Sequence, residues 1–283
     1  MLREYYKLAK PGIVYGNSIA AAAGFLLASI HGFNALLFTV TIFGIALLMA
    51  SACVFNNYTD RNIDAAMTRT AKRALVTGVI STRSALFFAT TLLILGFAIL
   101  AVSTNLLTVI IGVIAFIDYV ILYAVAKRKT SFGTAVGTVS GALPPVAGYI
   151  AVTGSLDLGA VCIFLVMVFW QMAHFYAIAV LRQTDYVAAH IPVYPVRHGF
   201  AATKRQIVIY ITLFIVSVIV MLLLGYGSYV IAIALLFVAI RWLYLSLSQA
   251  TDNHTVWARQ VFKWSLYALL AFCATIAATP FLF

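Results

Sequence analysis

Three oxygen-bearing side chains recur at four-residue intervals near the end of the second apolar segment: Asn56, Asp60 and Asp64. On an α-helix this spacing places all three on one face. Two carboxylates one turn apart repel each other, and a divalent cation would turn that repulsion into coordination. Such hard oxygen ligands suit Mg²⁺ held jointly with phosphate oxygens of a substrate. The alternative is a solvated helix end whose acids pair with Arg61 or Arg69.

Basic residues follow the acidic motif and recur after the fourth apolar segment. Arg69, Lys72 and Arg73 form the first cluster, and Lys127 and Arg128 belong to the second. Guanidinium and ammonium groups bind phosphate oxygens well. We therefore predict that both clusters neutralise a bound diphosphate, in addition to setting the membrane topology.

A third polar group closes the sixth apolar segment. At about 100° per residue, Asp185 lies about 20° from His174, and Trp170 lies about 40° to its other side, if one helix continues that far. We predict a stripe of aromatic, imidazole and carboxylate groups, because an ionisable pair within or beside a membrane span is a functional hypothesis by default. The alternative for His174 is a hydrogen-bonded core histidine. Asp118, inside the fourth apolar segment, receives no role.

The elements that position these residues are membrane helices. The 283 residues are 64% hydrophobic and 9% charged, whereas a soluble domain is about half apolar and a quarter charged. A span needs about 20 mostly apolar residues. We predict an all-α polytopic membrane protein with one domain over residues 1–283. The nine expected spans cover roughly residues 13–31, 35–57, 84–103, 105–125, 133–152, 158–181, 206–225, 228–247 and 264–282.

The basic residues indicate the orientation of these spans. All 18 Lys and Arg residues fall on one side of the expected topology, so the positive-inside rule places the N-terminus and the long loops in the cytoplasm and the C-terminus outside. The net charge of +11 does not indicate nucleic-acid binding, because no basic stripe lies on a soluble domain. Neither a cleavable signal nor a transit peptide is evident, which favours the bacterial inner membrane.

Several segments resemble the UbiA-type intramembrane prenyltransferases, and within them the branch that uses haem. The resemblance runs from about residue 8 to about residue 200. The acidic motif is typical of the whole superfamily, and the later segments are typical of the haem branch. The segments are Lys10-Pro11-Gly-Ile, Asn57 to Thr70, Lys127-Arg128-Lys-Thr130-Ser, Gly141 to Tyr149, His174-Phe-Tyr-Ala177 and Asp185 to Val196.

The resemblance implies nine helices around a central cavity that opens to the cytoplasm and sideways to lipid. It implies farnesyl diphosphate as donor, haem B as acceptor and Mg²⁺ as cofactor, with haem A synthase or terminal oxidase assembly proteins as partners. On this hypothesis Asp60, Asp64 and Asp185 are catalytic and, with Asn56, bind the metal. Many superfamily members carry a second acid four residues after the equivalent of Asp185, but this chain has Ala189 there, so a complete second set of metal ligands is not expected.

The remaining roles follow from the same hypothesis. Diphosphate would be bound by Arg69, Lys72, Arg73, Lys127 and Arg128. His174 would ligate the haem iron or orient the porphyrin, and Arg182 would pair with a propionate.

Three other functions compete with this interpretation. The same transfer could use another acceptor, such as an aromatic quinone precursor. A transporter or channel would also carry intramembrane acids and a helix broken at Pro144 and Pro145, but transport favours ionisable groups near the midplane. A haem-handling protein without catalysis is the third.

Overall fold

The computed structural model describes residues 1–248 and 253–281, and within these residues it is helical and has no strand. Nine helical segments there are long and apolar enough to cross a membrane, as the sequence predicted. The helices are α1 (Leu2–Leu8), α2 (Pro11–Ala28), α3 (Ala35–Ala66), α4 (Thr82–Ser103), α5 (Leu106–Ile117), α6 (Tyr123–Lys129), α7 (Gly133–Thr153), α8 (Leu158–Leu181), α9 (Gln183–Ala188), α10 (Tyr194–Leu223), α11 (Tyr229–Leu247) and α12 (His254–Ala277). A π-helical turn, η2 (Asp118–Leu122), joins α5 to α6, and two short 3₁₀ turns, η1 (Ser29–His31) and η3 (Thr279–Phe281), follow α2 and α12.

Three spans extend furthest beyond the predicted bounds. Helix α3 continues nine residues beyond the expected end at 57, α10 begins at Tyr194 instead of 206, and α12 begins at His254 instead of 264. The added turns are polar, so an apolar-run criterion misses them, although their backbone hydrogen bonding is helical. Helix α10 also contains a kink at Gly199, whose φ of 78° lies in the left-handed region that favours glycine.

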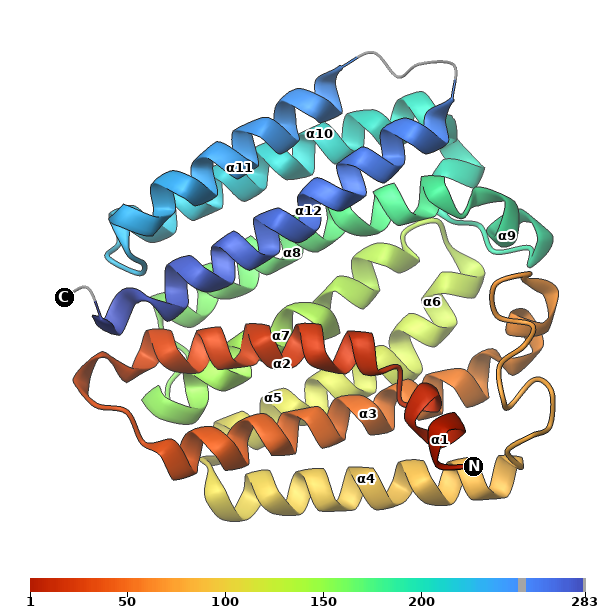
Figure 1. Ribbon diagram of the computed structural model, residues 1–283, viewed down its shortest axis with the longest axis horizontal. Coiled ribbons are helices and arrows are strands. Elements are labelled where there is room, and N and C mark those ends of the chain that lie inside the picture. Colours follow the sequence, from red (N-terminus) through yellow and green to blue (C-terminus); the bar gives the residue numbers. More distant parts are fainter. Residues whose placement is uncertain (249–252, 282–283) are drawn as a thin grey trace.

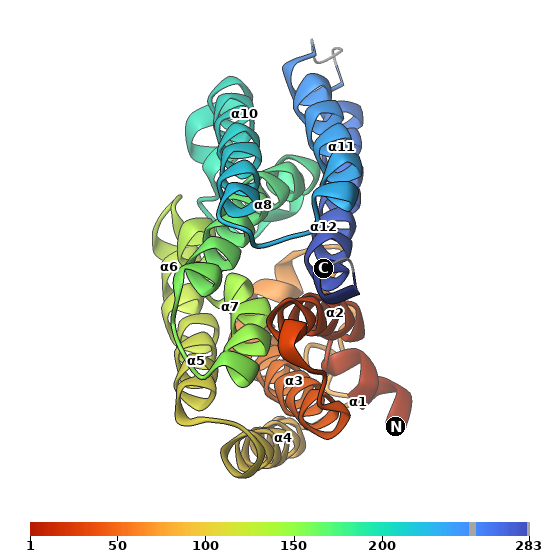
Figure 2. The same cartoon turned by 90° about the vertical axis from the view of Figure 1, so that its left-hand side faces the viewer.

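Helix α7 lies at the centre of the bundle. It packs against α2 on one side and α8 on another, while α4 lies outside α3 (Figures 1 and 2). Helices α10 and α12 pack against α8, and α11 packs against α12 and α10. A Cβ added at Gly148 would lie 2.0 Å from the Ala21 carbonyl oxygen, and one at Gly24 would lie 2.0 Å from that of Pro145. Glycine is therefore needed for the close backbone contact of α2 and α7, as is typical of membrane helices.

The two prolines inside α7 leave its backbone with fewer internal hydrogen bonds. Pro144 and Pro145 lack N–H groups, so the carbonyls four residues earlier lose their usual donors. On the neighbouring π-turn, Asp118 Oδ2 accepts the Ser140 backbone N–H at 3.0 Å. The buried Asp118, which received no role from the sequence, thus has a structural partner in the backbone of α7.

The two ends of the bundle differ. The N-terminus, α9 and the connections after α3 and α6 lie at one end, and the C-terminus lies at the other (Figure 1). The basic loops of the sequence meet at the first of these ends, where the acidic motif of α3 also lies.

Candidate active site

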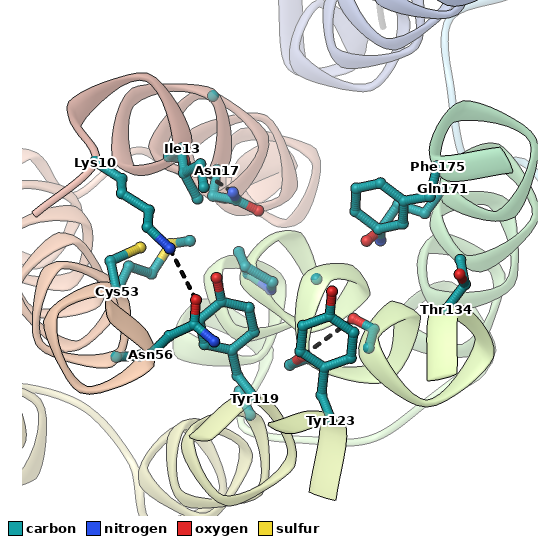
Figure 3. A pocket seen from close by; sticks show the side chains of 18 of the residues that line it. Lys10, Ile13, Asn17, Cys53, Asn56, Tyr119, Tyr123, Thr134, Gln171 and Phe175 are labelled. Carbon is teal, nitrogen blue, oxygen red and sulfur yellow. Dashed lines mark hydrogen bonds between the residues drawn. The ribbon is translucent and has the colours of Figure 1, made fainter. Parts of the chain in front are cut away.

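A cavity of about 550 Å³ lies between α2, α3, α7 and α8, with further walls from α5, α6 and α12. Its deeper wall is apolar and includes Leu48, Leu100, Ile111 and Leu143. Its charged residues come from the segment before α2, the end of α3 with the loop that follows it, and the end of α6. Uncharged polar side chains of α2, α3, α7, α8 and the π-turn complete the lining (Figure 3). One chamber therefore offers both a charged mouth and an apolar interior.

The acidic motif forms one wall of this chamber. Asn56, Asp60 and Asp64 lie on the unbroken helix α3, are all buried and all line the cavity. The structure thus places the three side chains on one helix face beside a chamber, as their spacing predicted.

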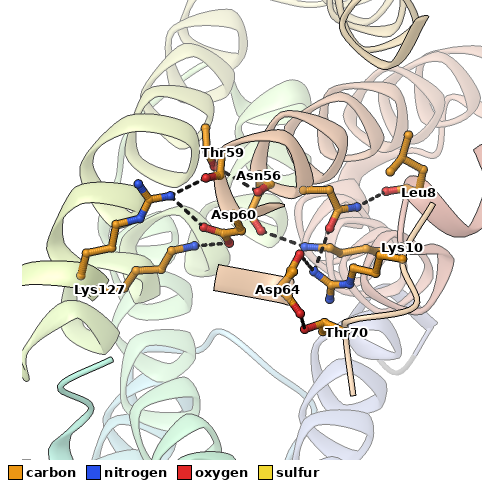
Figure 4. A network of polar contacts seen from close by, with 11 residues as sticks. Leu8, Lys10, Asn56, Thr59, Asp60, Asp64, Thr70 and Lys127 are labelled. Carbon is orange, nitrogen blue, oxygen red and sulfur yellow. Dashed lines mark hydrogen bonds and ion pairs between the residues drawn. The ribbon is translucent and has the colours of Figure 1, made fainter. Parts of the chain in front are cut away.

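Asp60 contacts two cations from the second basic cluster. Its Oδ2 is ion-paired with Lys127 Nζ, and its Oδ1 lies 3.2 Å from Arg128 Nη2 (Figure 4). Arg128 also donates to the Thr59 carbonyl at 2.6 Å. The end of α6 is therefore fastened to the acidic face of α3.

Asp64 is held by the first basic cluster. Arg73 Nη1 lies 2.5 Å from Asp64 Oδ2 and donates to Asn57 Oδ1 at 3.0 Å. Asn57 in turn donates to the Leu8 carbonyl at 2.7 Å, and Thr70 Oγ1 donates to the Asp64 carbonyl at 2.9 Å. The loop after α3 therefore folds back so that Arg73 compensates a buried carboxylate, as buried charges require.

Asn56 contacts a cation that the sequence interpretation did not assign. Lys10 Nζ donates to Asn56 Oδ1 at 2.8 Å and lines the cavity. Lys10 has a left-handed φ of 52° and immediately precedes Pro11 at the start of α2. Burial lowers the pKa of Lys10 to about 8. In the sequence, the position of Lys10 directly before the first span could have indicated that its side chain reaches the site.

The structure does not show the alternative arrangement, in which the acids of α3 pair with Arg61 or Arg69. Arg61 donates to the Tyr58 carbonyl and lies over the Tyr58 ring, 4.6 Å from its centroid. Arg69 lines the cavity but forms no ion pair with a described acid. Lys72 is absent from the cavity lining among the described residues.

The predicted stripe of Trp170, His174 and Asp185 is only half correct. Helix α8 ends at Leu181, and Arg182 has non-helical angles (φ −117°, ψ 21°) before α9 starts. The extrapolated angle therefore fails, and the Asp185 carboxylate accepts a hydrogen bond from Thr68 Oγ1 at 2.8 Å. Among the described residues that line the cavity are Trp170 and His174, but neither Asp185 nor Arg182.

Trp170 and His174 do form a pair. Their rings stack with centroids 4.8 Å apart and an interplanar angle of 21°. Both contact one residue of α12: Trp170 Nε1 donates to the Ser265 carbonyl, and His174 Nδ1 lies 2.7 Å from Ser265 Oγ. No local sequence signal connects Ser265 to the site.

Other polar residues of the cavity were also not assigned from the sequence. Tyr119 and Tyr123 stack with centroids 5.8 Å apart, and Gln171 points into the cavity from α8 (Figure 3). Tyr119 and Tyr123 are four residues apart in an apolar span, a spacing that could have indicated a shared face.

The donor set can be tested against a metal ion. Within residues 1–248 and 253–281, no three His, Cys, Asp or Glu side chains are grouped so that they could hold one. The acidic face instead offers two carboxylates and one amide oxygen, all directed at a chamber. This set fits Mg²⁺, which takes few protein ligands and shares its remaining positions with water and substrate phosphates.

Comparison with known proteins identifies the family. The UbiA prenyltransferase family matches residues 17–267. The chain is 44% identical over 271 residues to protoheme IX farnesyltransferase of Yersinia enterocolitica, covering 95% of this chain and 92% of the relative. It is 42% identical over 282 residues to the protein of that name from Photorhabdus laumondii, covering 99% and 96%.

Solved structures of similar fold agree. A digeranylgeranylglyceryl phosphate synthase structure superposes with a TM-score of 0.79 at 21% identity and 98% coverage of both chains. A UbiA homologue from Archaeoglobus fulgidus bound to GPP and Mg²⁺ gives a TM-score of 0.74 at 16% identity, covering 94% of this chain and 99% of that one. These structures share the fold, and the family match over residues 17–267 together with the 42–44% identical relatives shows that the chain belongs to the UbiA prenyltransferase family.

Proposed function

We propose that this protein transfers the farnesyl group of farnesyl diphosphate to a vinyl group of haem B, giving haem O and diphosphate. The observation that carries the proposal is the identity of 42–44% over nearly the whole chain with relatives named protoheme IX farnesyltransferase. A cavity with a charged mouth and an apolar interior supports it, because the donor has a charged head and an apolar tail.

The charged mouth is the proposed diphosphate site. Asn56, Asp60 and Asp64 would hold Mg²⁺, whose charge offsets that of the leaving diphosphate. Asp185 does not line the cavity among the described residues, and its Oδ1 accepts from Thr68, so it would have to move to join them. In this structure Lys127, Arg128 and Arg73 form ion pairs with Asp60 and Asp64. Once these acids bind Mg²⁺, the three cations can bind phosphate oxygens instead. Arg69 and Lys72 lie on the same basic loop.

These contacts favour ionisation of the donor. As the C–O bond to diphosphate breaks, negative charge grows on the leaving oxygens, and the surrounding cations stabilise that charge more than they stabilise the intact donor. The allylic cation that remains lies in the apolar part of the cavity, where Leu48, Leu100 and Leu143 exclude water.

The acceptor completes the reaction. The π electrons of the haem vinyl group form the new C–C bond to the allylic carbon, which leaves a cation on the vinyl carbon next to the porphyrin. Water adds to that carbon and loses a proton, giving a hydroxyethylfarnesyl substituent. We assign His174, which lines the cavity, to the haem iron. Arg182 does not line the cavity among the described residues, so we assign it no contact with a propionate.

The decisive experiment expresses the chain in bacterial cells that lack haem O and measures the extracted haems by mass spectrometry. Haem O is the expected product, and its absence beside a prenylated quinone precursor would favour the alternative acceptor. Diphosphate release from the purified protein with both substrates separates the enzyme from a transporter or a haem carrier.

We also propose a bacterial inner-membrane location with the N-terminus and the basic loops in the cytoplasm, and haem A synthase or oxidase assembly proteins as partners. The support is that the basic connections share one end of the bundle (Figure 1). Reporter fusions at residue 1 and residue 283 should report opposite sides. Cross-linking in native membranes tests the partners.

A further inference from the structure

Ser265 of α12 contacts both Trp170 and His174 of α8. The Ser265 carbonyl accepts the Trp170 Nε1–H at 2.7 Å, and its hydroxyl lies 2.7 Å from His174 Nδ1. The His174 ring stacks on Trp170, and its centroid lies 5.0 Å from that of Phe262. One serine therefore fastens both members of the Trp170–His174 pair.

The direction of the hydrogen bond follows from counting hydrogens. Ser265 Oγ donates its single hydrogen to the Phe262 carbonyl at 2.6 Å, so toward His174 it can only accept. Nδ1 must therefore carry a proton. His174 is buried and forms no ion pair with any described residue, and burying an unpaired charge is costly. The neutral ring that results has its lone pair on Nε2.

This tautomer is the one that can bind a metal through Nε2. His174 lines the cavity, and its Nε2 accepts no hydrogen bond from any described protein group. Metal-binding histidines characteristically donate their other N–H to a fixed acceptor, which orients the ring and raises its basicity. Ser265 Oγ, itself tied to the Phe262 carbonyl, is such an acceptor.

We propose that Ser265 is a positioning residue that holds His174 in the Nδ1–H form, so that Nε2 binds the iron of the haem acceptor. The inference deepens the proposed function and rests on it. Ser265, 91 positions from His174 in the sequence, would then belong to the haem-binding site. Iron ligation through His174 would let the protein bind haem more tightly than a metal-free porphyrin.

The test measures iron ligation and not turnover. The full-length protein in lipid nanodiscs is titrated with ferric protoporphyrin IX without farnesyl diphosphate, and the ferrous nitrosyl complex is examined by electron paramagnetic resonance. The wild type should show hyperfine splitting from a second axial nitrogen, and His174→Ala should lose it. Ser265→Ala should weaken haem binding by about 10- to 100-fold and reduce that splitting.

Ser246 provides a matched control. It is fully buried on α11, outside the cavity, and its hydroxyl donates to the Leu243 carbonyl at 2.7 Å, three residues earlier, as Ser265 does to Phe262. Ser246→Ala removes the same kind of bond and should leave both the haem affinity and the spectrum unchanged. Metal-free protoporphyrin IX should bind equally to the wild type and to Ser265→Ala.

Unchanged haem affinity and splitting in Ser265→Ala would overturn the inference, as would equal weakening of haem and metal-free porphyrin. If the wild type makes haem O but its nitrosyl spectrum lacks a histidine nitrogen, only this inference fails. If the cells make no haem O although the splitting depends on His174, the transfer activity fails and the haem site remains.

Discussion

Helical periodicity predicts a shared face for the acids of α3 and for the polar residues at the end of α8, but only the α3 residues lie on one continuous helix. On α3 the helix is continuous through Asp64, and the acids reach the cavity. On α8 the helix ends at Leu181, and Asp185 turns to Thr68. Periodicity is a reliable guide only as far as the helix continues.

The two regions also differ in electrostatics. The α3 site holds charges that are compensated by cations from distant segments, whereas the Trp170–His174 pair on α8 forms no ion pair with a described residue and is fixed by hydrogen bonds to one serine. At the α3 site, Mg²⁺ can replace a basic side chain as the partner of a carboxylate. On α8, the hydrogen bonds hold the rings of Trp170 and His174 in one orientation. Mutations should therefore have different consequences in the two regions.

The largest effect is expected at the acidic face. Asp64→Asn should lower farnesyl transfer by about 10²- to 10³-fold, because it removes a charge that binds the metal at the developing diphosphate. The measurement is haem O formation per amount of protein inserted in membranes. Asp157→Asn is the control, since Asp157 caps α8 away from the cavity and should retain activity. Near-normal transfer by Asp64→Asn would contradict a metal role.

Removing the partner of Asp64 should affect stability. Arg73→Met leaves a carboxylate that is 3% exposed without its cation, which should cost about 3 kcal/mol. Thermal unfolding in detergent should show a lower Tm, and Mg²⁺ with diphosphate should recover part of it by supplying a replacement cation. Arg83→Met, at an exposed position of α4, should have little effect. A lower Tm that Mg²⁺ and diphosphate leave unchanged would argue against cation exchange.

A smaller effect is expected at Lys10. Lys10→Met should raise the KM for farnesyl diphosphate about tenfold, because it removes a cation from the lining of the cavity proposed to bind the charged head of the donor, while kcat changes less. Steady-state kinetics test this. Lys7→Met is matched, because Lys7 is exposed and, among the described residues, its ion pair is with Glu4. If both variants raise KM equally, the effect is general surface charge and not a contact in the cavity.

The smallest effect is expected at the end of α8. Asp185→Asn keeps an oxygen that accepts from Thr68, so transfer should fall only a few-fold, on the order of one lost charge-assisted contact. The informative quantity is the ratio of its activity to that of Asp64→Asn. Equal losses in the two variants would mean that Asp185 leaves Thr68 and binds the metal directly.

The sequence by itself determined the nine spans, the shared face of Asn56, Asp60 and Asp64, and the gathering of basic loops at one end, because helical periodicity and hydropathy are local properties. The tertiary structure alone decided that Lys127 meets Asp60 across 67 residues, that Lys10 reaches Asn56 and that Ser265 holds His174. These contacts depend on which helices pack together, and single-chain patterns do not contain that information. The break at Arg182 also lies outside what periodicity can predict, because the non-helical angles there are seen only in the folded chain.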